Sequence, residues 1–538
     1  MTTTTATRSE LSPWAPFGHG AFSLLWTATL ISNIGTWMHD VGAGWLMTTL
    51  TPSPAIIALV QAATTAPVFL FGLFAGALAD RLDKKRLLII VNVAMVIIAS
   101  LLAIAVQLEV MSPALLVGFT FALGAGAAFI APAWQAIVPS LVSREALSSA
   151  IALNSMGINI ARAVGPAIAG FLIVGVGLTA PFIANIISLV IIIIALAIWK
   201  PTAGPERRLP PEPLFGAMVT GLRHAAYNGP LKATLLRALG FFLFASAYWA
   251  LLPLIAKGVP SGGAQLYGIL LTSTGAAAVA GALTLPKLRK RMSSDLLVII
   301  GSLGTALALI LFALAPFAIT VVIGSLLAGA SWIAVLTSLN VSAQTALPNW
   351  VRARGLSVLL MVFFGSMTLG ATLWGQVAEH ASVTAALLAA AVGIIVLIPF
   401  TRKAHLGQGE DLDLTPSMHW AALPSLPHDE DDRGPVLILI EYQINQEHTQ
   451  DFLRAIHQLK DERYRDGAYD WGITQSAENS SLWTEYFFVS SWLEHERQHE
   501  RVTAHDRDLQ DAVKAFHTGA EPPRVSHLIS HSTKGAPQ

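Results

Sequence analysis

The sequence predicts an all-α membrane protein of twelve helices in two six-helix halves, followed by a small soluble α+β domain. Three observations support this fold class. The 538 residues are 54% hydrophobic and only 12% charged, whereas soluble domains carry about 25% charged residues. Long apolar stretches follow one another as far as Lys403, and polar sequence follows. Short motifs recur between the two halves of the apolar part.

Twelve stretches are long enough to span a bilayer, which requires about 20 mostly apolar residues. They lie near 22–47, 55–79, 87–108, 114–138, 148–174, 178–199, 233–256, 264–286, 295–314, 317–346, 355–378 and 382–401. Lys and Arg gather in the turns after the even-numbered stretches, with Lys257 as the exception. Because loops rich in Lys and Arg stay cytoplasmic, we expect both chain termini to be cytoplasmic.

Composition divides the chain into five segments. They are a first half (1–200), a proline-rich central loop (201–232), a second half (233–403), an acidic linker (404–434) and a soluble tail (435–531). The central loop contains an amphipathic piece over 214–227. In the tail, hydrophobic patterning predicts strands and helices in the order βαββαβ, with a second helix over 493–516. This order is that of a ferredoxin-like α+β fold.

The two membrane halves repeat two motifs in the same order. Gly76-Ala77-Leu78 recurs as Gly281-Ala282-Leu283, an offset of 205 residues. The pair Gln135 and Pro139 recurs as Gln344 and Pro348, an offset of 209 residues. Parallel repeats of this kind are typical of secondary transporters that bind substrate between their halves.

Residues 15–405 resemble the major facilitator superfamily. The run Gly76–Lys85 is similar to the signature loop of that superfamily, with Asp83 in place of one glycine. The run Pro132–Leu172, with Asn33–Met38 and Gly44–Leu46, resembles the subfamily of bacterial exporters that includes the enterobactin exporter. The tail resembles dimeric α+β domains related to antibiotic-biosynthesis monooxygenases.

The resemblance implies secondary active export of an amphipathic small molecule, a siderophore or drug-like compound, by alternating access and proton antiport. It also implies a multi-pass protein of the bacterial inner membrane that dimerises through its tail. Thr120 lies near the place where proton-coupled drug exporters have an arginine, which departs from the usual coupling route. An importer of the same fold, or a membrane-anchored enzyme or sensor that acts through the tail, remains an alternative.

Two charged residues inside the membrane spans are candidates for coupling. Asp40 lies in the outer half of the first span, where an ionised carboxylate is costly. Arg162 lies about 22 Å into the fifth span at about 1.5 Å per residue, so it should face a polar cavity or a carboxylate such as Asp40. The alternatives are an interfacial residue for Asp40 and a purely structural ion pair.

The loop after the second span is a candidate gate, because a charge pair across the two halves would favour one conformation. Its residues are Gly76, Asp80, Arg81, Lys84 and Lys85. The alternative is a solvated turn that only sets topology.

Neutral polar and aromatic residues within the spans are candidates for the transport path. They are Trp37, Gln135, Asn154, Asn159, Asn340 and Gln344. Hydrogen bonds between helices and packing against lipid are equally common roles for such residues. Gly165, Pro166 and Gly170 form a Gly-Pro motif, similar to that of drug–proton antiporters, that favours close approach and bending of helices.

The tail contains the sequence His495-Glu496-Arg497-Gln498-His499, which matches the H-E-x-x-H helix of zinc proteases. We do not expect a protease, because a catalytic zinc requires a third ligand and a substrate cleft. His505, Asp506 and His517 are nearby and leave a weak metal site open. With no cofactor motif, no cysteine and a net charge of zero, the sequence predicts neither an enzyme, a cofactor nor a nucleic-acid partner.

Overall fold

The computed structural model describes residues 12–143, 145–200, 214–260, 262–410, 412–417, 419–420 and 433–530. Within these residues, the membrane part consists of twelve long helices. They are α1 (Gly20–Leu50), α2 (Pro54–Arg81), α3 (Lys84–Gln107), α4 (Pro113–Ile137), α5 (Leu147–Gly175), α6 (Ala180–Ile198), α8 (Gly229–Gly258), α9 (Ala264–Arg289), α10 (Ser294–Ala313), α11 (Ala318–Thr345), α12 (Arg352–His380) and α13 (Val383–Thr401). The helices follow the predicted stretches closely, so the predicted twelve-helix fold is confirmed.

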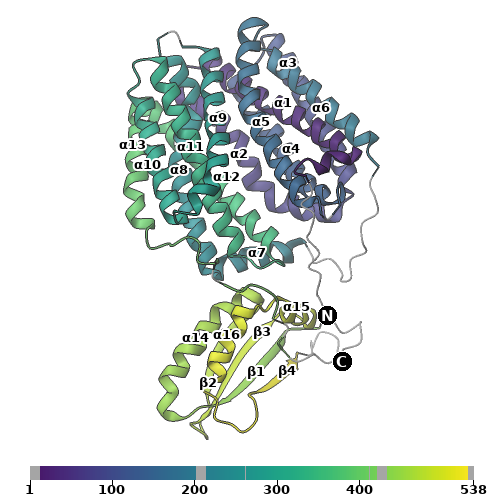
Figure 1. Cartoon of the computed structure of the whole chain (residues 1–538), viewed down its shortest axis with the longest axis vertical. Helices are drawn as coiled ribbons and strands as arrows, with labels where there is room; N and C mark the ends of the chain where they lie inside the picture. Colours follow the sequence, from purple (N-terminus) through teal and green to yellow (C-terminus); the bar gives the residue numbers. More distant parts are fainter. Residues whose placement is uncertain are drawn as a thin grey trace, which may run out of the picture. The chain divides into compact units, whose positions relative to one another are not determined.

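Eleven of these helices are long and apolar enough to cross a membrane. The exception is α1, which belongs to the bundle because it packs against both α5 and α6 (Figure 1). The apolar stripe of α1 includes Phe22 and Leu25, which are buried in a hydrophobic cluster. The Trp26 indole Nε1 of the same helix donates to the Leu153 carbonyl of α5 over 2.9 Å. The lower hydropathy of α1 reflects polar residues that face the interior of the bundle.

Serine and aspartate residues define where several of the helices begin. Ser53, Asp83, Ser112, Ser293 and Ser382 precede α2, α3, α4, α10 and α13, and each side chain accepts a hydrogen bond from a backbone N–H in the first turn. These bonds satisfy amides that have no partner inside the helix. They fix the starts of five helices at the short turns that the sequence indicated.

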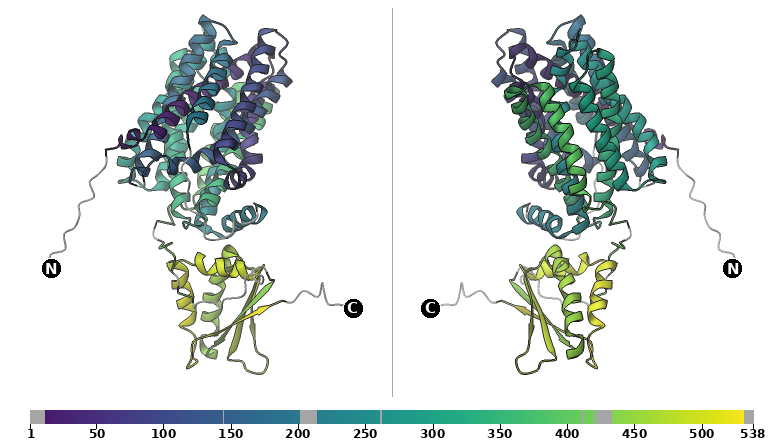
Figure 2. Two further views of the ribbon diagram at one scale, coloured as in Figure 1. Left: turned by 90° about the vertical axis from the view of Figure 1, so that its right-hand side faces the viewer. Right: turned by 90° about the vertical axis from the view of Figure 1, so that its left-hand side faces the viewer.

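The tail forms one antiparallel sheet with helices on a single face (Figure 2). Its elements are β1 (Val436–Gln443), α14 (Thr449–Asp466), β2 (Tyr469–Gln475), β3 (Leu482–Val489), α15 (Trp492–Arg501), α16 (Ala504–Lys514) and β4 (Arg524–Ile529). The strand order is β2-β3-β1-β4. The predicted βαββαβ order is present with one correction: the single helix predicted over 493–516 is two helices. A capping box between Thr503 and Asp506 starts α16 anew.

By their internal contacts, the residues form two units. One unit contains most of the membrane helices. The other contains 215–235, 340–358 and 404–538, and therefore combines the tail with α7 (Leu214–Tyr227) and the connection between α11 and α12. The amphipathic helix predicted over 214–227 thus forms as α7. The grouping of the tail with these membrane-half segments was not indicated by the sequence.

Three contacts join α7 and the connection between α11 and α12 to the tail within the second unit. Arg223 of α7 lies 3.4 Å from the Glu494 carboxylate of α15. The guanidinium of Arg501, also on α15, lies 4.6 Å from the ring centroid of Trp350. Tyr227 of α7 stacks on Tyr464 of α14 with ring centroids 5.0 Å apart. Because charges and flat rings meet here, this contact is directional as well as apolar.

Candidate functional site

A cavity of about 290 Å³ lies between the two membrane halves. We call it the central cavity. Its wall includes six aromatic residues, one cation and one carboxylate. The residues that define its chemistry are Trp37, Asp40, Arg162, Trp249, Tyr267 and Trp332. They come from α1, α5, α8, α9 and α11, so both halves contribute to the same site.

Arg162 is the cation of the central cavity. Its guanidinium lies 5.7 Å from the Trp37 ring centroid, within the range of a cation–π contact. Its Nε is buried and, among the described residues, has no hydrogen-bond partner. The Trp249 indole nitrogen and the Tyr248 hydroxyl are also buried without a partner. Of these donors, the Arg162 Nε and the Trp249 indole nitrogen belong to residues that line the cavity, and a polar ligand or water there would satisfy them.

Asp40 is half-buried on α1 and lines the central cavity. It also lines a second cavity of about 330 Å³ inside the first membrane half, which we call the first-half cavity. Thr64 is the other residue common to the two walls. In the part of the chain that the structure describes, Asp40 and Arg162 share a cavity but form no ion pair. Asp40 therefore stands between two cavities, with its carboxylate available to protons or ligand.

The first-half cavity is lined by polar groups from six helices. Gln135 and Asn154 belong to its wall, and the Asn154 carbonyl oxygen accepts a hydrogen bond from the Trp134 indole nitrogen over 3.0 Å. Asn92 and Asn185, from α3 and α6, also line it. The cavity is thus polar on several sides, although it lies within apolar helices.

The six residues predicted for the transport path are not all at one site. Trp37 lines the central cavity and Gln135 and Asn154 line the first-half cavity. The other three residues line neither cavity. Asn159 donates to the Ser155 carbonyl within α5 over 2.9 Å. The side-chain amide nitrogen of Gln344 donates to the side-chain amide oxygen of Asn340 over 2.6 Å. Gln344, the residue that repeats Gln135 in the second half, is therefore not an equivalent cavity residue.

Small residues let α5 approach both α1 and α9. A Cβ added at Gly165 would lie 2.6 Å from Trp37 Cβ, and one at Gly170 would lie 3.4 Å from the Ala264 carbonyl oxygen. On the opposite helix, a Cβ at Gly268 would lie 2.7 Å from the Pro166 carbonyl oxygen. The Gly-Pro motif therefore lies at the seam between the halves, where close contact between helices requires the absence of side chains.

The seam is also closed at the helix ends that the charge pattern places outside the cell. Lys257 Nζ donates to the Thr48 carbonyl over 2.8 Å. The Glu379 carboxylate of α12 accepts hydrogen bonds from the Ser53 hydroxyl over 2.6 Å and from the Ala55 amide over 3.3 Å. Glu379 thereby caps the start of α2, a helix of the other half. These bonds join the two halves and must break if that side opens.

The predicted gate residues have separate surroundings. Lys85 Nζ donates to the Ala197 carbonyl over 3.1 Å and also to the Trp199 carbonyl, which stabilises the carboxyl end of α6. Lys84 is half-buried, and a Cβ added at Gly76 would meet nothing within 4 Å. The side chains of Asp80 and Arg81 lie outside the described residues. The gating role of this loop stays a prediction.

Several residues at the cavities were not singled out from the sequence. Trp249 and Tyr267 line the central cavity, and His39 and Asn185 line the first-half cavity. His39 and Asn185 carried a signal, because polar residues inside apolar spans usually face a cavity. Trp249 and Tyr267 carried none, since aromatic residues near the ends of membrane helices are common.

A family model described as a transmembrane secretion effector, within the major facilitator superfamily, matches residues 11–535. A staphyloferrin A transporter of Staphylococcus aureus (strain NCTC 8325 / PS 47) is 26% identical over 270 residues, which cover 49% of this chain and 66% of the relative. That match spans just under two thirds of the relative. The enterobactin exporter EntS of Escherichia coli O1:K1 / APEC is 25% identical over 383 residues, which cover 70% of this chain and 90% of the relative.

Solved structures share the fold of the membrane part. The crystal structure of a bacterial homolog to the human lysosomal transporter Spinster matches with a TM-score of 0.58 at 17% identity, covering 73% of this chain and 97% of that one. A POT family transporter in complex with 5-aminolevulinic acid matches with a TM-score of 0.58 at 13% identity, covering 71% and 96%. At these identities the likeness extends to the fold alone.

Proposed function

Because this chain belongs to the transmembrane secretion effector family of the major facilitator superfamily, we propose that it exports an anionic, amphipathic small molecule of the siderophore class by proton antiport. The observation that carries the proposal is the central cavity, where Arg162 lies among aromatic rings and its Nε has no hydrogen-bond partner in the described part of the chain. A carboxylate or phenolate on the substrate would pair with this guanidinium, while the rings would pack against the apolar part.

The siderophore class is supported by the relatives, which are named for staphyloferrin A and enterobactin. The outward direction is supported by the relative named as an enterobactin exporter and by the family description as a secretion effector. An importer with the same cavity remains the alternative. We place the protein in the bacterial inner membrane with both termini in the cytoplasm, because Lys and Arg gather on the turns of one side.

Proton coupling would act through Asp40. This carboxylate is the acidic residue on the walls of both cavities. Protonation would lower the cost of keeping it inside the membrane, and release of the proton would restore a negative charge near Arg162. The protonation state of Asp40 would therefore affect the binding of an anionic substrate, and bound substrate would affect the protonation of Asp40. Such coupling between substrate and proton is required for a proton gradient to drive transport.

The test is transport by the purified protein in vesicles with an imposed pH gradient and a panel of catecholate and carboxylate siderophores. The wild type should accumulate a substrate in inside-out vesicles when their interior is acidic. Asp40→Asn should transport at the same rate with and without the gradient, because the exchangeable proton is gone. Glu109→Gln, which changes a carboxylate at a helix end away from both cavities, is the control and should respond like the wild type.

Two results would contradict the proposal. Retention of the full gradient response by Asp40→Asn would remove Asp40 from the coupling mechanism. Accumulation only in right-side-out vesicles that take up external substrate would make the protein an importer.

A further inference from the structure

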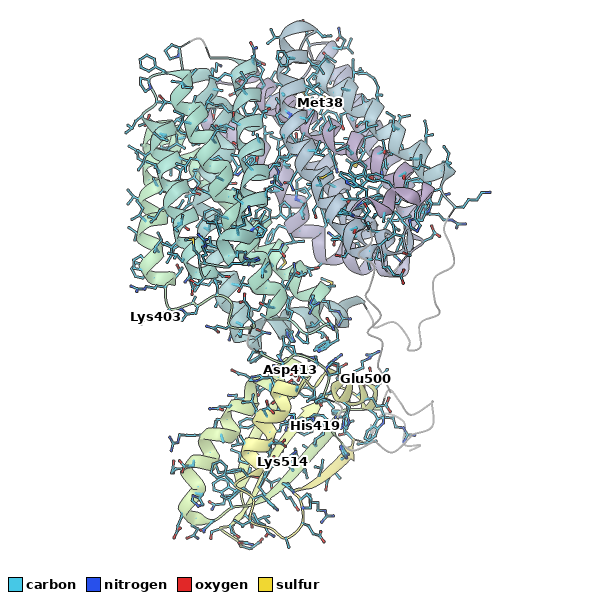
Figure 3. The ribbon with its side chains drawn as sticks, in the orientation of Figure 1. Met38, Lys403, Asp413, His419, Glu500 and Lys514 are labelled. Atoms are coloured by element: carbon cyan, nitrogen blue, oxygen red, sulfur yellow. The ribbon has the colours of Figure 1, made fainter. Side chains whose placement is uncertain are left out.

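The tail contains a cavity of about 390 Å³, larger than either membrane cavity. Figure 3 labels His419 and Lys514, two of the residues that line it. One part of its wall is apolar and includes Ile438, Ile440 and Phe487. Another part consists of histidines, which the transport function does not use.

Three of these histidines converge from two elements. His495 and His499 lie one turn apart on α15, and His527 lies on β4. The ring centroid of His495 is 4.9 Å from that of His499 and 4.9 Å from that of His527. One nitrogen from each of the three rings lies within 4.8 Å of the others. The sheet thus supplies the third ligand that the H-E-x-x-H sequence lacked.

One ring nitrogen of His495 forms a hydrogen bond and the other does not. Its Nδ1 lies 3.1 Å from Oε1 of the Gln498 side-chain amide, to which it can donate. Its side chain is only 2% exposed, and its Nε2 is buried with no hydrogen-bond partner among the described residues. A donor bond from one ring nitrogen to a neighbouring oxygen fixes the tautomer and leaves the other lone pair for a metal.

His495 is buried, and His499 and His527 are half-buried. Burial is the main reason why the pKa of His495 falls to about 3 and that of His499 to about 4. Burial also lowers the pKa of His527. A fourth histidine on the cavity wall, His419, is already engaged: its ring nitrogens lie 2.6 Å from the Ser417 hydroxyl and 3.0 Å from the Gln510 carbonyl oxygen.

We propose that His495, His499 and His527 bind one divalent transition-metal ion, with a further coordination position open to the tail cavity. Three histidines with an open position suit Zn²⁺ and its first-row neighbours. Tetrahedral coordination at about 2.0–2.1 Å brings ligand nitrogens to about 3.4 Å from one another. Small rotations of the rings from their observed positions would achieve this spacing.

The site differs from that of a zinc protease. In such enzymes the glutamate of the motif acts as the general base. Here the Glu496 carboxylate accepts a hydrogen bond from the Trp492 indole nitrogen over 3.2 Å. The open position faces a cavity with Arg463 and Lys514 on its wall, and these cations favour water or a small anionic ligand.

The other nearby candidates do not gather. The Asp506 carboxylate accepts hydrogen bonds from Thr503 and lies 2.9 Å from Arg465 Nη2. His517 Nδ1 accepts from the Gln443 amide over 2.9 Å. His505, Asp506 and His517 therefore do not form the weak metal site that the sequence left open.

The test is metal binding by the full-length protein, purified without a histidine tag and stripped with a chelator. Zn²⁺ content by mass spectrometry and Co²⁺ absorption spectra are the two readouts. The wild type should bind one equivalent. His527→Asn and His499→Gln should each weaken binding at least about 100-fold, because loss of an outer-shell partner alone costs 10–100-fold. Gln498→Leu should weaken it about tenfold for that reason.

His505→Ala is the matched control, since His505 belongs to the same segment but not to the cluster, and it should bind like the wild type. Circular dichroism of each variant verifies that the tail remains folded. The proposal is overturned if the wild-type protein does not bind one equivalent of Zn²⁺ or Co²⁺ with micromolar or tighter affinity. It is also overturned if one equivalent binds equally well to folded His527→Asn and His499→Gln proteins.

Discussion

Two buried arginines, Arg162 in the membrane part and Arg463 in the tail, have opposite surroundings. Arg463 Nε lies 3.0 Å from the Glu485 carboxylate, and Glu462 lies 3.7 Å away. Arg162 has the face of Trp37 and a buried Nε with no partner in the described part of the chain. A buried charge that is paired with an opposite charge has its partner within the fold. A buried charge that faces a cavity without such a partner is available to a ligand.

The difference has an energetic basis. An ion removed from water loses several kcal/mol of solvation, and partners must restore it. Glu485 illustrates this restoration, because its carboxylate also accepts hydrogen bonds from the Trp471 indole nitrogen over 3.0 Å and the Tyr442 hydroxyl over 3.2 Å. Among the described residues Arg162 Nε has no such partner, and water or substrate in the central cavity would supply one.

The largest expected effect is on the tail. Arg463→Met should destabilise it by about 3–5 kcal/mol, because Glu485 would be left buried and unpaired. The double variant Arg463→Met/Glu485→Leu should recover most of that loss, since it removes both charges. Pulse proteolysis of the full-length protein in urea measures both. Equal destabilisation by the single and double variants would show that packing, not charge, dominates.

The second effect is on transport. Arg162→Ala should lower the transport rate about 100-fold, equivalent to about 2.7 kcal/mol, with little change in stability. Arg162→Lys should retain intermediate activity because it keeps the charge but not the planar fork. Vesicle uptake and thermal unfolding are measured on the same preparations. If Arg162→Ala unfolds the protein as Arg463→Met does, the contrast between the two arginines is wrong.

A third variant moves Arg162 without changing its charge. A Cβ at Gly275 of α9 would lie 2.9 Å from the Arg162 carbonyl oxygen, so Gly275→Val should displace α5. We expect transport to fall about tenfold, or about 1.4 kcal/mol. Gly118→Val is the control, because a Cβ there meets nothing within 4 Å. Equal transport by the two variants would show that the position of Arg162 is not limiting.

The smallest effect concerns Glu462. Burial raises the pKa of its carboxyl group to about 8, although Arg463 opposes the shift. Its folded pKa exceeds the unfolded one, so its stabilising contribution is complete below about pH 4.5 and is lost as the pH rises through about 8. Glu462→Gln should remove this loss, so its free energy of unfolding should differ less between pH 6 and pH 9 than that of the wild type. Urea unfolding at pH 6 and pH 9 tests the change. A wild-type tail that is no less stable at pH 9 than at pH 6 would contradict it.

Much of the fold was predictable because lipid imposes a strict rule on sequence. Backbone groups in a bilayer must bond within the helix, so apolar stretches of sufficient length become helices. The motifs also indicated the major facilitator superfamily, and the family match confirms that membership. Asp40 and Arg162 were recognisable as charges in apolar spans, and both line the central cavity. The likeness of the tail to antibiotic-biosynthesis monooxygenases stays a prediction.

The sequence by itself determined the set of membrane helices and showed which charged residues lie within apolar stretches. The side of the membrane on which each loop lies stays a prediction. Tertiary structure decided which of those residues meet. Gln135 faces a cavity while its repeat Gln344 bonds to Asn340, and His527 reaches the H-E-x-x-H helix only because β4 returns beside β1. Local sequence patterns indicate whether a residue faces lipid, water or the protein interior. A functional site, in contrast, depends on contacts between segments that are distant in the sequence.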